Sequence, residues 1–187
     1  MRIGAYPGSF DPLTVAHLAI VESAIETCDL DRVDLVLSEV ALGKSAHHVH
    51  LAERFTVLRR VAERDARLGA TVTGHRLLVD IASGYDVLVM GADKWAQVND
   101  PAWYDSPEAR DAALAALPPV AVAPRPGFAV PEGVVRLDVE VAHGEVSSTA
   151  VRSGAHDWMA PEAAELATAT GAWIDPARYA RWLEGDA

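Results

Sequence analysis

The chain has 187 residues, half of them apolar and 23% charged, and its 27 acidic against 16 basic side chains give a formal net charge of −11. This length and composition are typical of one globular domain with a buried core, and the acidic surplus argues against a general nucleic-acid binder, which needs a basic face. No apolar run is long enough for a membrane helix and residues 1–20 lack a secretory signal, so we expect a cytoplasmic protein without membrane contact.

The N-terminal stretch predicts a strand, a tight loop and a helix. A short apolar run at residues 3–6 indicates the strand, and the Pro-Gly-Ser stretch that follows indicates the turn. After Thr14 an apolar stripe has helical spacing: Leu18, Val21, Ile25 and Cys28. Cys28 is the only cysteine, which excludes an internal disulfide and a cysteine-based metal cluster.

The junction of this strand and helix is suited to an anion. Free backbone N–H groups and the positive end of the helix dipole meet above the strand end, where phosphate is the expected ligand. Gly8 lets the backbone approach such a ligand closely. Thr14 and His17, three residues apart, lie on one face of the helix and can both donate to the same anion.

The next segment predicts a second strand followed by a loop. Residues 33–38 are apolar enough for a buried strand, and the order strand, helix, strand predicts a right-handed parallel crossover. The loop of residues 39–50 lies at the sheet edge where ligands bind, and it contains Lys44. It also contains His47, His48 and His50, which we expect to be surface or substrate-loop groups, because their spacing fixes no metal geometry.

Beyond this loop, helices and strands continue to alternate. We expect helices at residues 51–66, 75–82, 107–117, 161–170 and 176–183, and strands at 70–73, 86–90, 120–122 and 134–139. Gly91 and Asp93 come directly after the strand of residues 86–90. A glycine there permits close backbone approach, and the carboxylate can accept from ribose hydroxyls.

A second candidate anion site lies at residues 146–152. Ser147 or Ser148 can cap a helix whose N–H groups then point at an anion, and Arg152 emerges within the first turn. A capping role alone would also explain the two hydroxyls.

Both segments resemble signatures of one family. The run Gly8-Ser9-Phe10-Asp11-Pro12 with Thr14 and His17 is similar to the (H/T)-x-G-H region of nucleotidyltransferases, which include nicotinate and nicotinamide mononucleotide adenylyltransferases and pantetheine-phosphate adenylyltransferases. Ser147-Ser148-Thr149 with Arg152 resembles the family's second signature. The resemblance implies that the first motif binds the triphosphate of ATP, that the second grips the β- and γ-phosphates, and that Lys44 contacts phosphate. Ala16 stands where the family has glycine, which leaves the choice of ATP or CTP open.

Three later segments are similar to those of bacterial nicotinate mononucleotide adenylyltransferases: Gly91-Ala92-Asp93, Pro101-x-Trp103-Tyr104 and Arg125-Pro126-Gly127. In those enzymes the matching tryptophan stacks on the pyridine ring and the tyrosine lies by its carboxylate. A flat aromatic face suits a cationic ring, although ordinary packing is the alternative for Trp103. The Thr-rich stretch of those enzymes is replaced here by residues 78–81, so nicotinate, nicotinamide and other acceptors stay open.

The sequence thus predicts an α/β, Rossmann-like domain with a parallel sheet of five strands and helices on both faces. It would span residues 1–187, with residues 155–187 as a C-terminal helical portion. The implied reaction transfers AMP from ATP to the phosphate of nicotinate or nicotinamide mononucleotide and releases pyrophosphate. Mg²⁺ would accompany the triphosphate, without metal ligands from the protein.

Other interpretations stay open at this point. One is an adenylyl- or cytidylyltransferase for another acceptor, such as phosphopantetheine or a specialised metabolite, and another is a non-catalytic nucleotide-binding protein. The oligomeric state is also open, with a homo-oligomer as one option. The predicted catalytic residues are Thr14, His17, Lys44 and Arg152; the predicted ATP contacts are Gly8, Ser9, Phe10, Thr14, His17, Gly91, Asp93, Ser147, Ser148, Thr149 and Arg152; the predicted acceptor contacts are Lys44, Trp103, Tyr104 and Arg125.

Overall fold

The computed structural model describes residues 1–39 and 48–185. Strands and helices alternate along the chain: β1 (Ile3–Gly8), α1 (Val15–Cys28), β2 (Arg32–Ser38), α2 (Leu51–Arg64), β3 (Leu68–Thr73), α3 (Leu78–Ile81), β4 (Val87–Gly91), α4 (Ala92–Asn99), α5 (Pro107–Ala115), β5 (Val120–Ala123), β6 (Val135–Arg136), α6 (Ser148–Arg152), α7 (Pro161–Thr170) and α8 (Pro176–Glu184). Three short 3₁₀ helices join them: η1 (Pro101–Trp103), η2 (Val141–His143) and η3 (His156–Trp158).

The strands form one parallel sheet of six strands in the order β3-β2-β1-β4-β5-β6. The predicted number of five strands was one short. The sixth, β6, lies within the strand expected at residues 134–139 and pairs with β5 through Ala121 and Val135. The rest of the stretch at residues 134–139, expected to be a longer strand, lies outside the sheet. The order of strands reverses between β1 and β4, and ligands of open α/β sheets bind at such a switch point.

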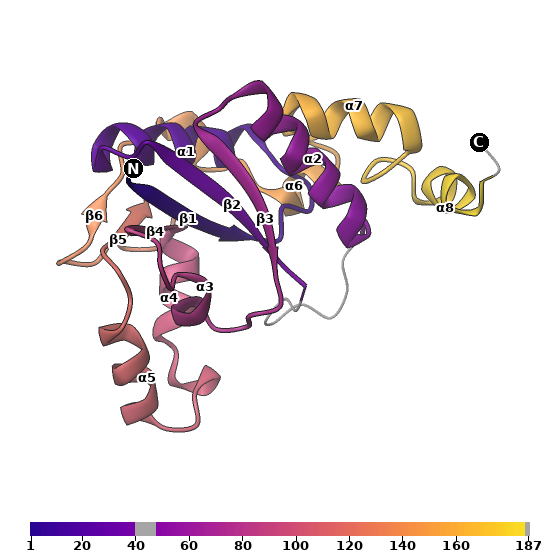
Figure 1. Ribbon diagram of the computed structural model, residues 1–187. Coiled ribbons are helices and arrows are strands. Elements are labelled where there is room, and N and C mark those ends of the chain that lie inside the picture. The colour runs from indigo at the N-terminus through magenta and orange to yellow at the C-terminus, as the bar shows by residue number, and fades with distance from the viewer. Residues whose placement is uncertain (40–47, 186–187) are drawn as a thin grey trace.

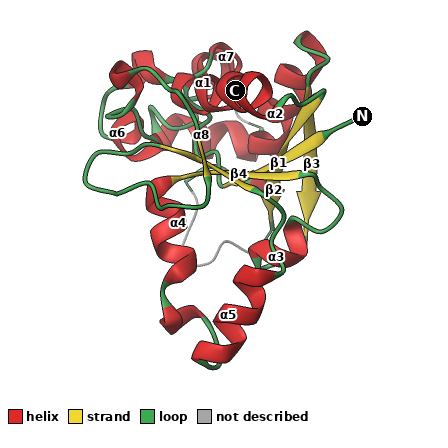
Figure 2. Cartoon of the chain, turned by 90° about the vertical axis from the view of Figure 1, so that its left-hand side faces the viewer, coloured by secondary structure: helices red, strands yellow, loops and turns green. Residues whose placement is uncertain are grey.

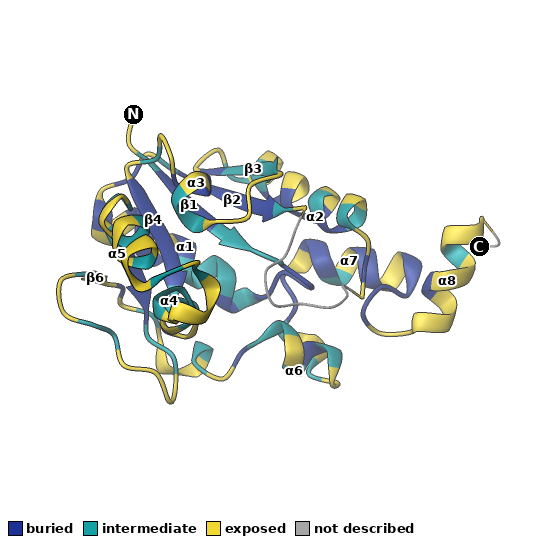
Figure 3. Ribbon diagram, turned by 90° about the horizontal axis from the view of Figure 1, so that it is seen from below, coloured by how far each residue is buried: buried dark blue, intermediate teal, exposed yellow. Residues whose placement is uncertain are grey.

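Helices cover both faces of the sheet, as predicted. Figure 2 shows α1, α2 and α7 on one side and α3, α4 and α5 on the other. Two apolar clusters fill these layers, because consecutive residues of a buried parallel strand point to opposite faces. Leu35 and Leu37 of β2 belong to the first cluster, whereas Val36 belongs to the second. Figure 3 shows the central strands buried, while α5 and α8 keep exposed outer surfaces.

The C-terminal helices lie beside the N-terminal motif. The amide of Ala160 donates to the carbonyl of Leu13 at 3.0 Å, and Thr14 forms an isolated bridge with Met159. Arg64 of α2 pairs with Glu162 and Glu165 of α7 at 2.6 and 2.9 Å. In Figure 1, α7 lies over α2 and α8 projects at the edge of the molecule. Across residues 1–39 and 48–185, no helix has the length and apolarity needed to cross a bilayer.

Candidate functional site

A cavity of about 830 Å³ opens at the carboxyl ends of the central strands. Its lining includes residues that follow β1, β4 and β5, and residues from α6 and from the loops at 124–130 and 136–149. The cavity therefore coincides with the switch point of the sheet. Most predicted site residues line it: Gly8, Ser9, Thr14, His17, Gly91, Asp93, Trp103, Tyr104, Arg125, Ser147, Ser148, Thr149 and Arg152. Lys44 and His47 lie outside the described residues.

The end of β1 is shaped by a buried aromatic side chain. Phe10 is 2% exposed, and its ring lies edge-on to the rings of Tyr6 and His17, with centroids 5.7 and 5.3 Å apart. A Cβ atom at Gly8 would lie 2.7 Å from the Phe10 ring. Glycine is thus required at position 8 to admit this ring. Phe10, predicted to contact ATP, supports the floor of the site from below and is not part of the cavity wall.

Thr14 and His17 contact one another at the start of α1. Thr14 is the N-cap residue, and its backbone amide donates to Nδ1 of His17 at 3.0 Å. The Thr14 hydroxyl lies 2.7 Å from the same nitrogen. An Nδ1 that accepts from the amide carries no proton, so in a neutral imidazole the proton resides on Nε2. His17 is thereby oriented as a donor through Nε2, while the Thr14 residue, 0% exposed, holds it.

The second motif is anchored directly to the first. Ser147 caps α6 by accepting from the amide of Ala150 at 3.1 Å, while Ser148 donates to the carbonyl of Pro12 at 2.7 Å. Arg152 donates to the carbonyl of Asp11 and, at 3.3 Å, to the hydroxyl of Thr149. The two signatures, more than 130 residues apart in the chain, therefore form a single structure.

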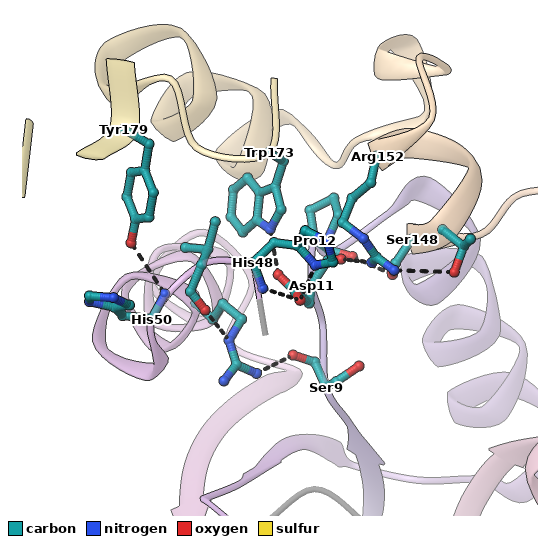
Figure 4. Close-up of polar contacts among 12 residues, drawn as sticks. Ser9, Asp11, Pro12, His48, His50, Ser148, Arg152, Trp173 and Tyr179 are labelled. Carbon is teal, nitrogen blue, oxygen red and sulfur yellow. Dashed lines mark hydrogen bonds and ion pairs between the residues drawn. The ribbon is translucent and has the colours of Figure 1, made fainter. Parts of the chain in front are cut away.

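Asp11 is a buried carboxylate at the centre of this structure, as Figure 4 shows. Trp173 donates its indole N–H to Oδ1 at 2.7 Å, and the amide of His48 donates to Oδ2 at 3.1 Å. Burial by itself would raise the pKa of the carboxyl. The bonds from Trp173 and His48, with the nearby guanidinium groups of Arg54 and Arg152, more than offset burial and lower the pKa.

A second group of charges lies after β4 and β5. Asp93 is in the first turn of α4, and its Oδ1 is 3.9 Å from Nε of Arg125. A Cβ atom at Gly91 would approach Oδ1 of Asp93 to 2.5 Å, so glycine leaves room for this carboxylate. Arg125 also donates to the carbonyls of Gly144 and Val146 at 3.1 and 2.8 Å. Burial, followed by the charge of Asp93, raises the pKa of Tyr6 in the cavity wall.

The remaining wall is aromatic and more exposed. Trp103 of η1 is 38% exposed and Phe128 is 45% exposed, and both line the cavity. The hydroxyl of Tyr104 donates to the carbonyl of Val98 at 2.9 Å. Tyr104, expected beside an acceptor carboxylate, thus already has a backbone partner, and its ring rather than its hydroxyl is the group available to line the site.

The sequence did not single out several residues that the structure places here. Tyr6 carries a weak local signal, a hydroxyl in an otherwise apolar strand that ends at the phosphate loop. Phe128 follows a segment already compared with the family. Trp173 and Arg54 carry no local signal, because their roles depend on bonds to Asp11 and to the carbonyl of Ser9, which are distant in the chain.

Among the described residues, no group of three His, Cys, Asp or Glu side chains is placed to hold a metal ion. Beside the two motifs the cavity is lined by His17, Ser148, Thr149 and Arg152, whose imidazole, hydroxyl and guanidinium groups suit phosphate oxygens.

The sheet order and the site at its switch point define a Rossmann-like nucleotide-binding protein. The family model described as "Cytidylyltransferase-like" matches residues 5–154, so the chain belongs to the cytidylyltransferase-like family. Recognition of the nucleotidyltransferase superfamily from the two motifs is thereby confirmed.

Two curated relatives align over most of their length. A probable nicotinate-nucleotide adenylyltransferase of Gluconobacter oxydans is 36% identical over 143 residues, which cover 70% of each chain. A phosphopantetheine adenylyltransferase of Clavibacter michiganensis is 36% identical over 155 residues, which cover 78% of this chain and 88% of the relative. In other relatives the aligned part spans only 35% to 57% of their length.

A solved structure shares the fold. It is a Plasmodium falciparum nicotinic acid mononucleotide adenylyltransferase complexed with NaAD, with a TM-score of 0.68 and 13% identity. The superposition covers 92% of this chain and 97% of that one. The Rossmann-like architecture predicted from the sequence is thus confirmed.

Proposed function

We propose that the protein is an adenylyltransferase that transfers AMP from ATP to the phosphate of nicotinate or nicotinamide mononucleotide and releases pyrophosphate. The observation that carries this proposal is a single cavity that joins two anchored phosphate motifs to an exposed tryptophan. The names of relatives with both kinds of acceptor support adenylyl transfer as the common chemistry.

In the proposed reaction, an oxygen of the acceptor phosphate attacks the α-phosphorus of ATP. The bond between that phosphorus and the bridging oxygen of the β-phosphate breaks, and pyrophosphate leaves with the electron pair. No covalent protein intermediate is needed. The protein's contribution is in-line placement of the two substrates and stabilisation of charge on the transferred and leaving phosphates.

Each motif has a distinct part in this scheme. His17, held by Thr14, donates Nε2–H to the α- or β-phosphate. Ser148 and Thr149 lie at the start of α6 and Arg152 lies at its end. These three residues would hold the β- and γ-phosphates. Lys44 would orient the attacking phosphate. Mg²⁺ would enter as part of the ATP complex and neutralise triphosphate charge, with ligands from phosphate and water oxygens.

Trp103 supports a pyridine ring as the acceptor. Its indole is partly exposed in the cavity, and a flat electron-rich face stabilises a cationic ring that stacks on it. Asp93, in the first turn of α4 and next to Arg125, would accept hydrogen bonds from a ribose.

A second candidate acceptor is phosphopantetheine. It is favoured by the relative of that name, 88% of which aligns with this chain. Such an acceptor would use the apolar part of the wall near Phe128 in place of aromatic stacking on a pyridine.

The test is pyrophosphate release with ATP or CTP and Mg²⁺, against nicotinate mononucleotide, nicotinamide mononucleotide and phosphopantetheine. Turnover with ATP and a pyridine mononucleotide is the expected result. Turnover with phosphopantetheine alone would transfer the assignment to the second acceptor. ATP binding without turnover on any of the three would reject the proposal in favour of a non-catalytic nucleotide-binding protein.

A further inference from the structure

The carboxylate of Asp11 joins segments that are remote in the sequence. It is 3% exposed and accepts from the indole of Trp173, which follows α7, and from the amide of His48, which precedes α2. Tyr179 of α8 does not bond to Asp11. Its hydroxyl accepts from the amide of His50 at 3.2 Å, and His50 is the residue that precedes α2. Figure 4 shows Trp173 and His48 meeting at Asp11, with the contact between Tyr179 and His50 beside them.

The backbone of the same segment carries α6. Arg152 donates to the carbonyl of Asp11, and Ser148 donates to the carbonyl of Pro12. The side chain of Asp11 is therefore fixed from the C-terminal segment, while its peptide group supports a residue of the pyrophosphate-binding motif. A rotation of the Asp11 residue would move the acceptor oxygen to which Arg152 is bound.

The charges around this segment are complementary. Arg54 is 2% exposed and donates to the carbonyls of Ser9 and Val49 at 2.6 and 3.0 Å. With Arg152 it places two guanidinium groups near one buried carboxylate. Removing one partner of a buried charge strongly destabilises the folded state. We therefore expect Asp11, Arg54 and Arg152 to keep their relative positions.

The backbone is also held in an uncommon conformation on both sides of the contact. Phe10, which precedes Asp11, has a φ of 42°, and Trp173 has a φ of 63°. Bulky residues rarely adopt the left-handed region, and they stay there only where surrounding contacts fix them. The indole–carboxylate bond is one such contact.

We propose that Asp11 and Trp173 are positioning residues for Arg152: the Trp173 indole fixes the Asp11 side chain, and the Asp11 carbonyl then orients the guanidinium toward the departing pyrophosphate. The inference rests on the proposed function, in which Arg152 holds that group. It makes the C-terminal segment after α7 part of the active site, although Trp173 does not line the cavity.

The experiment measures the affinity of the full-length protein for inorganic pyrophosphate with Mg²⁺ by calorimetry. Trp173→Phe removes the N–H donor and keeps an aromatic ring, and it is made alone and together with Arg152→Ala. Trp182→Phe is the matched control, because Trp182 stacks on Tyr179 at 6.0 Å on the same C-terminal segment. We expect Trp173→Phe to weaken pyrophosphate binding about fivefold in the natural background and to have almost no effect when Arg152 is absent. Trp182→Phe should have no effect in either background.

An equal loss in both backgrounds would overturn the inference, because a general structural defect does not depend on Arg152. Unchanged affinity in Trp173→Phe, or no pyrophosphate binding by the unaltered protein, would also overturn it. If Trp173→Phe does not fold, Asp11→Asn, which removes the charge of the group that accepts from the Trp173 indole, is made with and without Arg152→Ala and judged by the same criterion. The substrate panel tests the proposed function separately: a silent panel with coupled pyrophosphate binding would support the positioning role and reject only adenylyl transfer.

Discussion

Beside β1 and α6, the side chains of Ser148 and Arg152 are bonded to backbone carbonyls of a distant segment. Beside η1 and in the turn after β5, the cavity wall also carries partly exposed aromatic rings. Ser148 and Arg152 are bonded to the carbonyls of Pro12 and Asp11, and the Thr14 residue is 0% exposed. Trp103 and Phe128 are 38% and 45% exposed. The first region is thus held by hydrogen bonds between the two motifs, whereas the rings of Trp103 and Phe128 in the second are partly exposed.

This difference separates the two tasks of a group-transfer enzyme. A triphosphate is the same in every reaction of such a family, so a fixed set of donors on a buried framework suits it. Acceptors differ between family members, and exposed side chains on loops can change without disturbing the core. The substitutions below test whether catalysis resides in the first region and acceptor choice in the second.

The largest effect is expected for His17→Ala. Removal of a donor that stabilises developing charge should lower kcat about 10²- to 10³-fold, because such donors act mainly in the transition state. ATP affinity should change little. Steady-state rates of pyrophosphate release and calorimetric ATP binding measure the two effects, and His156→Ala, at an exposed position outside the cavity, is the control. An unchanged kcat would remove His17 from the mechanism.

Asp11→Asn should lower the free energy of unfolding by about 2 kcal/mol at pH 7, because hydrogen bonds to a buried charge are lost. The folded-state pKa of Asp11 lies below the ordinary value of 3.8. The carboxylate therefore stabilises the fold above that pH, and the stabilisation is lost as the pH falls through the folded-state pKa.

Urea unfolding of both proteins between pH 7 and pH 3 measures this difference. It should be largest at neutral pH and shrink at acidic pH. Asp157→Asn, which neutralises an exposed carboxylate, should show almost no difference at any pH. A difference between the natural protein and Asp11→Asn that stays constant over the whole range would contradict the electrostatic origin.

Trp103→Ala should raise KM for a pyridine mononucleotide about tenfold, because a cation–π contact in a partly desolvated site contributes on the order of 1 kcal/mol or more. KM for ATP should be unaffected, and Trp103→Phe should be intermediate. Initial rates at varied acceptor concentration check this prediction. If KM for ATP rises instead, the tryptophan belongs to the nucleotide side and the comparison between the two regions fails.

The smallest effect is expected for Thr14→Val, which removes the hydroxyl near His17 and leaves the backbone amide bond in place. A decrease of about threefold in kcat with unchanged ATP affinity is expected for the loss of one neutral hydrogen bond. Thr14→Ser should restore the rate. A loss of ATP affinity larger than the loss in kcat would show that the hydroxyl binds phosphate directly.

The sequence by itself determined the class of fold and the two motifs typical of the nucleotidyltransferase superfamily. Apolar runs and helical stripes located the main strands and helices because these patterns are local. The ends of elements were less certain: α3 is only Leu78–Ile81, shorter than the helix predicted at residues 75–82, and β6 is only Val135–Arg136. Such short elements depend on pairing and packing, not on a repeating pattern.

Only the tertiary structure decided how the motif residues contact one another. The sequence assigned phosphate contacts to both Thr14 and His17, and in the fold the Thr14 residue is 0% exposed, with its hydroxyl 2.7 Å from Nδ1 of His17. It assigned Asp11 no role, and the fold made it the point where Trp173 and Arg152 meet. The physical reason is that a hydrogen bond depends on distance and direction in space, which residues more than 140 positions apart acquire only when the chain has folded.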